Sequence, residues 1–277
     1  ANITSPILPG LNGAVQLGFF RVPAADDGQK SPRGIVHDYG GGLDVGAANW
    51  SPRNSDGTYR GMKPASFGLI LSRNTMSVRI GNRAGLSNVI QSAQLAGFHG
   101  NISRTPALYL GTWEASPLDI ASAYSVFANG GVRPTPYIID HITDSQGQPR
   151  FAITKSKRTV YSQRAANITS SILQQVCKPG GTAGKITALG FKSPCGGKTG
   201  TTNVNRTTMV VLCKIDGFDI YAVILDSTLQ QRYRDVRKLL NYAKATLSPY
   251  NAFKKGDTFE GAKLKGGATN RGDAVAV

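Results

Sequence analysis

One short segment, residues 195–203 with the sequence CGGKTGTTN, constrains the fold of this chain more than any other. Its glycines lack a Cβ atom and let the backbone come close to a ligand. Lys198 adds a positive charge that suits a carboxylate or a developing anion. The residues that follow at 207–213 are mostly β-branched and apolar. We therefore predict two strands, at 196–202 and 207–213, joined by a tight turn, with the Lys-Thr-Gly face at the sheet edge.

Three cysteines occur in the chain, Cys177, Cys195 and Cys213. An odd number does not form a disulfide framework. If the hairpin is centred near Val204, Cys195 and Cys213 lie opposite each other, and a bond between them depends on geometry that a sequence does not show. The alternative is that all three are small buried hydrophobic side chains. Both interpretations stay open.

The charge is strongly basic, with 32 Lys+Arg against 16 Asp+Glu and a formal net charge of +16. This balance is typical of a soluble protein with a cationic surface, or of a protein with a polyanionic partner such as nucleic acid, anionic lipid or an anionic wall polymer. Neither a zinc-ligand spacing nor an aromatic RNA-binding motif accompanies it, so specific nucleic-acid binding is not predicted. His37, His99 and His141 have no partners at metal-ligand spacing, and no metal or organic cofactor is predicted.

Length and composition, 277 residues of which 40% are hydrophobic, permit a full globular core. No stretch approaches the ~20 apolar residues of a membrane span. Periodicity predicts helices over 63–97, with stops at Gly85 and Gly97, over 117–128 after an N-cap at Ser116, and over 163–176 and 229–246. Further strands are predicted at 137–139, 151–153, 207–215 and 219–226.

Three regions follow from this pattern. Residues 1–49 are a loop-rich segment with short strands, in which 38–42 form a turn or flexible loop. Residues 50–246 form the main domain, and residues 247–277 are a basic, glycine-rich tail expected to be disordered. The strand at 219–226 is apolar on both faces, so we expect its outer edge to pair with an unassigned segment or with another chain.

Several segments, in order, resemble the transpeptidase domain of bifunctional (class A) penicillin-binding proteins. They are WSPRN at 50–54, LSRNT at 71–75 as a Ser-x-Asn element, 106–131, Gly-Thr-Ala at 181–183 and Lys-Thr-Gly at 198–200. Residues 208–242 are more similar to D-alanyl-D-alanine carboxypeptidases, which share this fold. The resemblance implies an α/β fold, an antiparallel sheet flanked by helices plus a helical region that holds Ser72 and Asn74.

The resemblance also implies roles for individual residues. Ser72 would relay a proton, Asn74 would hold the substrate amide, and Lys198 would polarise Ser72. Thr199, Gly200 and Thr201 would form the substrate-binding strand, in which the threonines hold the terminal carboxylate of a D-Ala-D-Ala stem peptide or of a β-lactam. The alternative for each motif is a structural one, polar helix residues and an edge-strand turn.

The family's nucleophile motif, Ser-x-x-Lys, is absent from the sequence, because no serine is followed three residues later by lysine. Thr182 has Lys185 at that spacing, but it belongs to the Gly-Thr-Ala segment. We therefore expect a domain that is incomplete at its N-terminus and lacks two strands of the family's sheet.

Two functions remain open. The chain is a portion of a D,D-transpeptidase that recognises peptidoglycan stem peptides for cell-wall cross-linking, or a degenerate pseudoenzyme that serves as a wall-binding or structural assembly module. Either function implies a periplasmic or other extracytoplasmic, cell-envelope location.

Overall fold

The computed structural model describes residues 13–14, 34–40, 50–100, 102, 104–201, 206–247, 258–263 and 271–275. Its helices are α1 (Ala65–Ile70), α2 (Asn74–Ala84), α3 (Leu86–Ala96), the 3-10 helix η1 (Pro106–Leu110), α4 (Pro117–Ala128), α5 (Gln163–Val176), α6 (Lys185–Ala188) and α7 (Gln231–Thr246). Among the described residues, no helix is long and apolar enough to cross a membrane.

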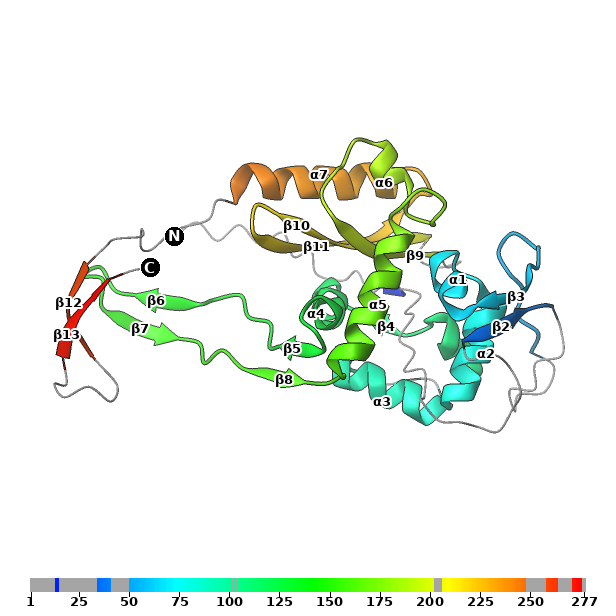
Figure 1. Ribbon diagram of the computed structural model, residues 1–277, viewed down its shortest axis with the longest axis horizontal. Helices are drawn as coiled ribbons and strands as arrows, with labels where there is room; N and C mark the ends of the chain where they lie inside the picture. The colour runs from blue at the N-terminus through cyan, green and yellow to red at the C-terminus, as the bar shows by residue number, and fades with distance from the viewer. Residues whose placement is uncertain are drawn as a thin grey trace.

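A three-stranded antiparallel sheet forms the centre, in the order β11 (Phe218–Ser227), β10 (Thr207–Ile215) and β9 (Cys195–Thr201). Helix α7 covers one face, and α4 and α5 lie on the other (Figure 1). Side chains of β10 alternate between these faces: Val210 belongs to the cluster with α4, whereas Met209 and Val211 belong to the cluster with α7. The predicted strands and the Asp216–Gly217 turn between them are confirmed.

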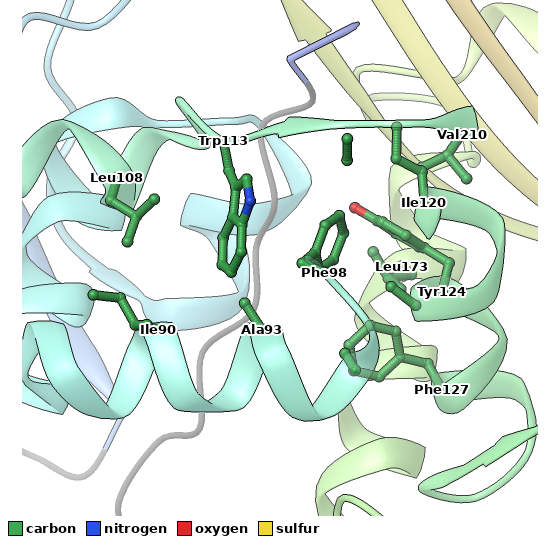
Figure 2. Close-up of a cluster of buried hydrophobic side chains, with 13 residues drawn as sticks. Ile90, Ala93, Phe98, Leu108, Trp113, Ile120, Tyr124, Phe127, Leu173 and Val210 are labelled. Atoms are coloured by element: carbon green, nitrogen blue, oxygen red, sulfur yellow. The ribbon is translucent and has the colours of Figure 1, made fainter. Parts of the chain in front are cut away.

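One of the two main hydrophobic clusters lies between α3, α4, α5 and the sheet. Figure 2 shows the Trp113 ring lying between Leu108 and Phe98, with Ile120, Tyr124 and Phe127 of α4 beyond Phe98. The Trp113 indole nitrogen donates to the backbone oxygen of His99 at 3.1 Å, so its polar edge is satisfied. This cluster fixes the helical region against the sheet, and the site depends on that arrangement.

The helical region predicted over 63–97 is wrong at 63–64, which lie in a strand, and at 71–73, where a turn separates α1 from α2. Other helix boundaries agree with the sequence prediction where a local signal exists. Gly85 and Gly97 end α2 and α3 with positive φ values of 83° and 113°. Ser116 caps α4 in a reciprocal capping box with Asp119. Helix α5 begins and ends where the periodicity places it.

The prediction for the hairpin at 137–153 is wrong in its first strand. The strands are β6 (His141–Thr143) and β7 (Pro149–Ala152), which lie beyond β5 (Val132–Pro134) and β8 (Lys157–Thr159) on an arm that extends from the body (Figure 1). The turn decides the register, because the Asp144 carboxylate accepts from the backbone N–H groups of Gln146 and Gln148. Ile142 therefore pairs with Phe151, and residues 137–139 precede the ladder.

The short strands predicted within residues 1–49 occur at 13–14 and 35–38, but the turn or flexible loop predicted at 38–42 needs a correction. So does the disorder predicted for the tail at 258–263 and 271–275; its other residues beyond 247 lie outside the described residues. Asp38 is not in a turn, because β2 (Ile35–Asp38) pairs with β3 (Gly61–Pro64); residues 41–42 of the predicted turn lie outside the described residues. In the tail, β12 (Thr258–Lys263) pairs with β13 (Arg271–Val275). Strand-forming residues such as Thr258 and Val275 face each other there, a local pairing that average composition hides.

Two more short strands complete the described elements, β1 (Gly13–Ala14) and β4 (Glu114–Ala115), which pair with each other. In the part of the chain that the structure describes, β11 pairs with β10 alone. A partner for its outer edge would have to come from other residues or from another chain.

Candidate active site

The Ser-x-Asn and Lys-Thr-Gly segments meet at one contact. The Lys198 ammonium donates to the Ser72 hydroxyl at 2.7 Å and to the backbone oxygen of Thr199 at 2.6 Å. Ser72 lies in the turn between α1 and α2, and Lys198 lies in the middle of β9. The two residues are 126 positions apart, so the fold and not local sequence brings them together.

The sequence predicted a helix at Ser72, but this residue lies in a tight turn with a left-handed backbone. Its φ is 54°, a region that costs a non-glycine residue on the order of 1 kcal/mol. The turn is closed by Arg73, whose N–H donates to Gly68 O at 2.8 Å. A Cβ on Gly68 would lie 2.9 Å from that of Met76, so glycine is needed where α1 approaches α2. The turn therefore holds Ser72 in an unusual conformation.

Lys198 is almost fully buried, with 2% of its surface exposed. Burial, with a smaller contribution from the charge of Arg232, lowers its pKa to about 7. None of the described residues forms an ion pair with Lys198. Close to neutral pH a large fraction of this amine is unprotonated, so it can exchange a proton with the Ser72 hydroxyl.

Strand β9, which the sequence predicted to bind substrate, is held by contacts that the sequence did not reveal. Thr199 donates from its hydroxyl to that of Thr182 at 2.8 Å, and the Tyr233 hydroxyl donates to the Thr182 backbone oxygen at 2.7 Å. Arg232 donates to Gly200 O at 3.3 Å. The Gly-Thr-Ala segment and the start of α7 thus fix β9 from one side.

The predicted site residues therefore differ in how they are placed. Ser72 and Lys198 are in contact, and Thr199, Gly200 and Thr201 continue the strand that carries Lys198. Thr199 is buried, whereas Thr201 is exposed at the end of β9. Asn74 begins α2, and its amide donates to the Arg53 backbone oxygen at 2.7 Å.

Two groups of residues escaped the sequence analysis. Arg232 and Tyr233 lie in α7, whose periodicity identified only an apolar face, and nothing local ties them to β9. Arg73 stood only as the middle residue of Ser-x-Asn, yet its guanidinium pairs with Asp38 at 2.9 Å. The strong signal in both cases is a buried charge, which a sequence does not show.

The open question about the cysteines is resolved by the hairpin register. Cys195 pairs with Cys213 and forms a disulfide with it, which ties β9 to β10 three residues before Lys198. Cys177 is a free, buried thiol, and burial raises its pKa to about 12. That thiol is therefore protonated and unreactive at neutral pH.

A cavity of about 230 Å³ lies next to the disulfide, between α4, α5 and the start of β9. None of the predicted site residues lines it, so it is not the predicted substrate site. No group of three or more metal-ligating side chains occurs among the described residues.

Comparison with known proteins places these motifs in a family. Residues 23–209 match the family described as penicillin binding protein transpeptidase domain. Penicillin-binding protein 1A of Neisseria lactamica is 40% identical over 169 residues, which are 58% of this chain and 21% of the relative. Penicillin-binding protein 1B of Haemophilus influenzae is 34% identical over 217 residues, 74% of this chain and 27% of that protein. The chain thus spans about a quarter or less of these relatives.

Solved structures show the same fold. The crystal structure of penicillin-binding protein 1A from Haemophilus influenzae matches 88% of this chain and 44% of that chain, with a TM-score of 0.65 and 20% identity. The D,D-transpeptidase domain of a peptidoglycan glycosyltransferase from Eggerthella lenta matches 77% of this chain and 60% of its own, with a TM-score of 0.63 and 18% identity. These matches confirm the predicted mixed α/β fold of antiparallel sheet and helices. With the family match over more than half of its length, the chain belongs to the penicillin-binding protein transpeptidase domain family.

Proposed function

We propose that this chain forms the substrate-gripping side of a D,D-transpeptidase site and recognises peptidoglycan stem peptides that end in D-Ala-D-Ala. The observation that carries the proposal is the Lys198–Ser72 contact of 2.7 Å between two family motifs. Family membership makes cell-wall synthesis the setting, and an extracytoplasmic location at the cell envelope follows from where that substrate lies.

Proton relay is the first role of the pair. Ser72 and Lys198 exchange a proton along their hydrogen bond, because the pKa of Lys198, lowered by burial to about 7, lies close to neutral pH. Acyl transfer also needs a nucleophile, and the sequence contains no Ser-x-x-Lys. The acylation step is therefore not assigned to a residue of this chain.

Carboxylate recognition is the second role. Lys198 and Arg232 are both buried and share no carboxylate partner among the described residues, so the end of β9 lies in a positive potential. The exposed Thr201 offers a hydroxyl and a backbone N–H at that end. Asn74 would hold the amide that precedes the carboxylate.

Titration calorimetry with synthetic stem pentapeptides tests recognition directly. A peptide that ends in D-Ala-D-Ala with a free carboxylate should bind, and the same peptide with an amidated C-terminus should bind at least tenfold more weakly, because it loses a charged hydrogen bond. Thr201→Val should weaken binding of the free acid, whereas Thr143→Val on the distant arm should not. Equal binding of both peptides, or of both variants, would overturn the proposal.

The absence of Ser-x-x-Lys and the net charge of +16 favour a second candidate, a non-catalytic module that binds the wall through its anionic polymers. Sedimentation with purified cell wall separates the candidates. Binding that survives enzymatic removal of the stem peptides and falls with salt supports the module, whereas binding that is lost with the peptides supports stem-peptide recognition.

We also propose a further partner, another segment or chain that pairs with the outer edge of β11 and completes the sheet. Ile220, Tyr221 and Val223 to Leu225 are only half-buried on this strand. Unpaired edges of this kind favour strand addition. Amide hydrogen exchange with light scattering tests the idea: slow exchange at the outer amides of β11 in an oligomer supports a partner chain, and rapid exchange in a monomer contradicts it.

A further inference from the structure

Arg73, the residue that follows Ser72, has a buried guanidinium bound to two carboxylates. Its Nε donates to Asp38 at 2.9 Å, and one terminal nitrogen donates to Asp56 at 2.7 Å. The other terminal nitrogen donates to the backbone oxygen of Thr58. Only 6% of the Arg73 side chain is exposed. All three guanidinium nitrogens of the residue that follows Ser72 thus donate a hydrogen bond.

Asp38 is the centre of this cluster, and its side chain is fully buried. One carboxylate oxygen accepts from Thr75 Oγ1 at 2.6 Å and from Asn54 Nδ2 at 2.7 Å. The other accepts from Arg73 and from the backbone N–H of Arg60 at 3.0 Å. Burial raises the pKa of Asp38, but the hydrogen bonds from Thr75 and Asn54 and the charge of Arg73 outweigh it, so the carboxyl group stays ionised at neutral pH.

The cluster holds the segment around Ser72 and Asn74 at two residues, Arg73 and Thr75. Arg73 and Thr75 both bind Asp38, and the N–H of Thr75 also donates to Asn54 Oδ1 at 3.3 Å. Asp38 of β2 and Asn54 of the loop at 50–60 thereby bind the residues next to Ser72, although neither belongs to α1 or α2. A serine with a φ of 54° keeps that conformation only if its surroundings hold it.

We infer that Asp38 and Arg73, with Asn54 and Thr75, form a positioning unit that holds Ser72 against Lys198 and Asn74 at the start of α2. Among the described residues, no hydrogen bond or ion pair joins any of these four side chains to Lys198, so we expect them to act through the backbone of residues 72–75. The importance of the contact for catalysis rests on the proposed function, but the contact itself does not.

A double-mutant cycle in the full chain tests the unit. The readout is the Lys198 side-chain Cε–Hε signal in lysine-labelled protein at a fixed pH of 5.5, assigned through Lys198→Met. In the unaltered chain, Ser72→Ala should shift this signal, because it removes the hydroxyl at 2.7 Å. In an Asp38→Asn/Arg73→Gln background the same Ser72→Ala substitution should cause no further shift, because Ser72 has already left Lys198.

Removing both charges together avoids leaving one buried charge without its partner, so this background is the one most compatible with folding. Arg73→Lys with Asp38 intact gives a second variant, which keeps the charge but loses the planar guanidinium with its several donors. In this background Ser72→Ala should still cause part of the shift of the Lys198 signal. A control background of Asp144→Asn/Arg150→Gln removes an ion pair on the distant arm and should leave the full shift.

An undiminished Ser72→Ala shift in both the Asp38→Asn/Arg73→Gln and the Arg73→Lys backgrounds would overturn the inference and leave the cluster a stabilising one only. Stem-peptide titration reports separately on the proposed function. If peptides fail to bind while the cycle shows the expected loss of coupling, the proposed function is wrong and the positioning unit stands.

Discussion

Two buried cations neighbour Ser72, Arg73 as the next residue in the chain and Lys198 through a hydrogen bond, and their surroundings differ. Arg73 is 5% exposed and is paired with Asp38 and Asp56. Lys198 is 2% exposed and has no carboxylate partner among the described residues, and the charged group that lowers its pKa further, Arg232, is another cation. Among the described residues, carboxylates neutralise the charge of Arg73 but not that of Lys198.

The difference distinguishes a charge that fixes geometry, that of Arg73, from a charge that can be lost near neutral pH, that of Lys198. A paired, fully hydrogen-bonded guanidinium stays charged at every accessible pH and fixes geometry. An unpaired buried ammonium is costly, and its pKa falls until it can lose its proton near neutral pH. Sites that exchange protons depend on this second condition.

Removing Arg73 should have the largest effect. Arg73→Met leaves the buried Asp38 carboxylate without its counter-ion, and we expect a loss of about 3 kcal/mol in the free energy of unfolding. Urea denaturation at pH 7 measures it. Arg206→Met, which removes an exposed pair with Asp226, is the control and should change little. A loss no larger than the control's would mean that the cluster is not structural.

The strand that carries Lys198 depends on a covalent tie that the Arg73 side lacks. Cys195→Ala/Cys213→Ala opens a link between residues 18 positions apart, and on the loop-entropy estimate stability falls by about 3 kcal/mol or less. Amide exchange should rise at β9 while the turn at 72–75 keeps its protection. Equal loosening of both regions would contradict the idea that they are held independently.

Lys198→Met should have the opposite sign to Arg73→Met. The unfolded chain holds the Lys198 proton up to its ordinary pKa of 10.5, and the folded chain only up to about 7. Between these values the unfolded state binds more protons, so stability rises with pH, and the cost of the charge is complete below pH 7. The substitution should therefore stabilise the protein by about 2 kcal/mol at pH 6, after the lost hydrogen bond is counted.

Near pH 10.5 this gain should vanish, because the amine is then neutral in both states for much of the time. Parallel denaturation series at pH 6 and pH 10 measure the difference. A variant that is less stable than the original at pH 6 would show that Lys198 has a compensating partner.

Arg232→Gln should give the smallest effect. It removes the second positive charge near Lys198 while burial, the larger cause, remains. We expect the pKa of Lys198 to rise by less than about one unit. Arg237→Gln, further along α7 and in contact with Leu189 O, is the matched control. A rise that restores more than half of the difference between about 7 and 10.5 would make Arg232, and not burial, the main cause.

Sequence patterns predicted those parts of the fold that depend on neighbours in the chain. Helix α5, the strands β9 to β11 and the capped start of α4 each carry a local period, turn or cap. The arm failed at 137–139 because the turn at 144–148, and not apolar character, sets its register. Motif order also predicted that Ser72 and Lys198 belong to one site.

Residues held by distant partners could not be predicted. Asp38 stood beside a glycine-rich run that favoured a turn, yet it lies in a strand and binds residues 35 and 37 positions away. Arg232 has its target 32 positions earlier in β9. A buried charge becomes meaningful only once the fold shows what surrounds it, and both sides of the site depend on such charges.

The pKa of Lys198 decides whether the amine beside Ser72 can exchange a proton near neutral pH. Lysine-labelled protein, titrated between pH 5 and 11, gives the midpoint from the Cε–Hε shift, and Lys198→Met identifies the signal. We predict a midpoint of about 7 for Lys198, far below the value of 10.5 that is ordinary for a lysine. A midpoint near 10.5 would contradict this interpretation of the site, because the amine beside Ser72 would then be an ordinary ammonium at neutral pH.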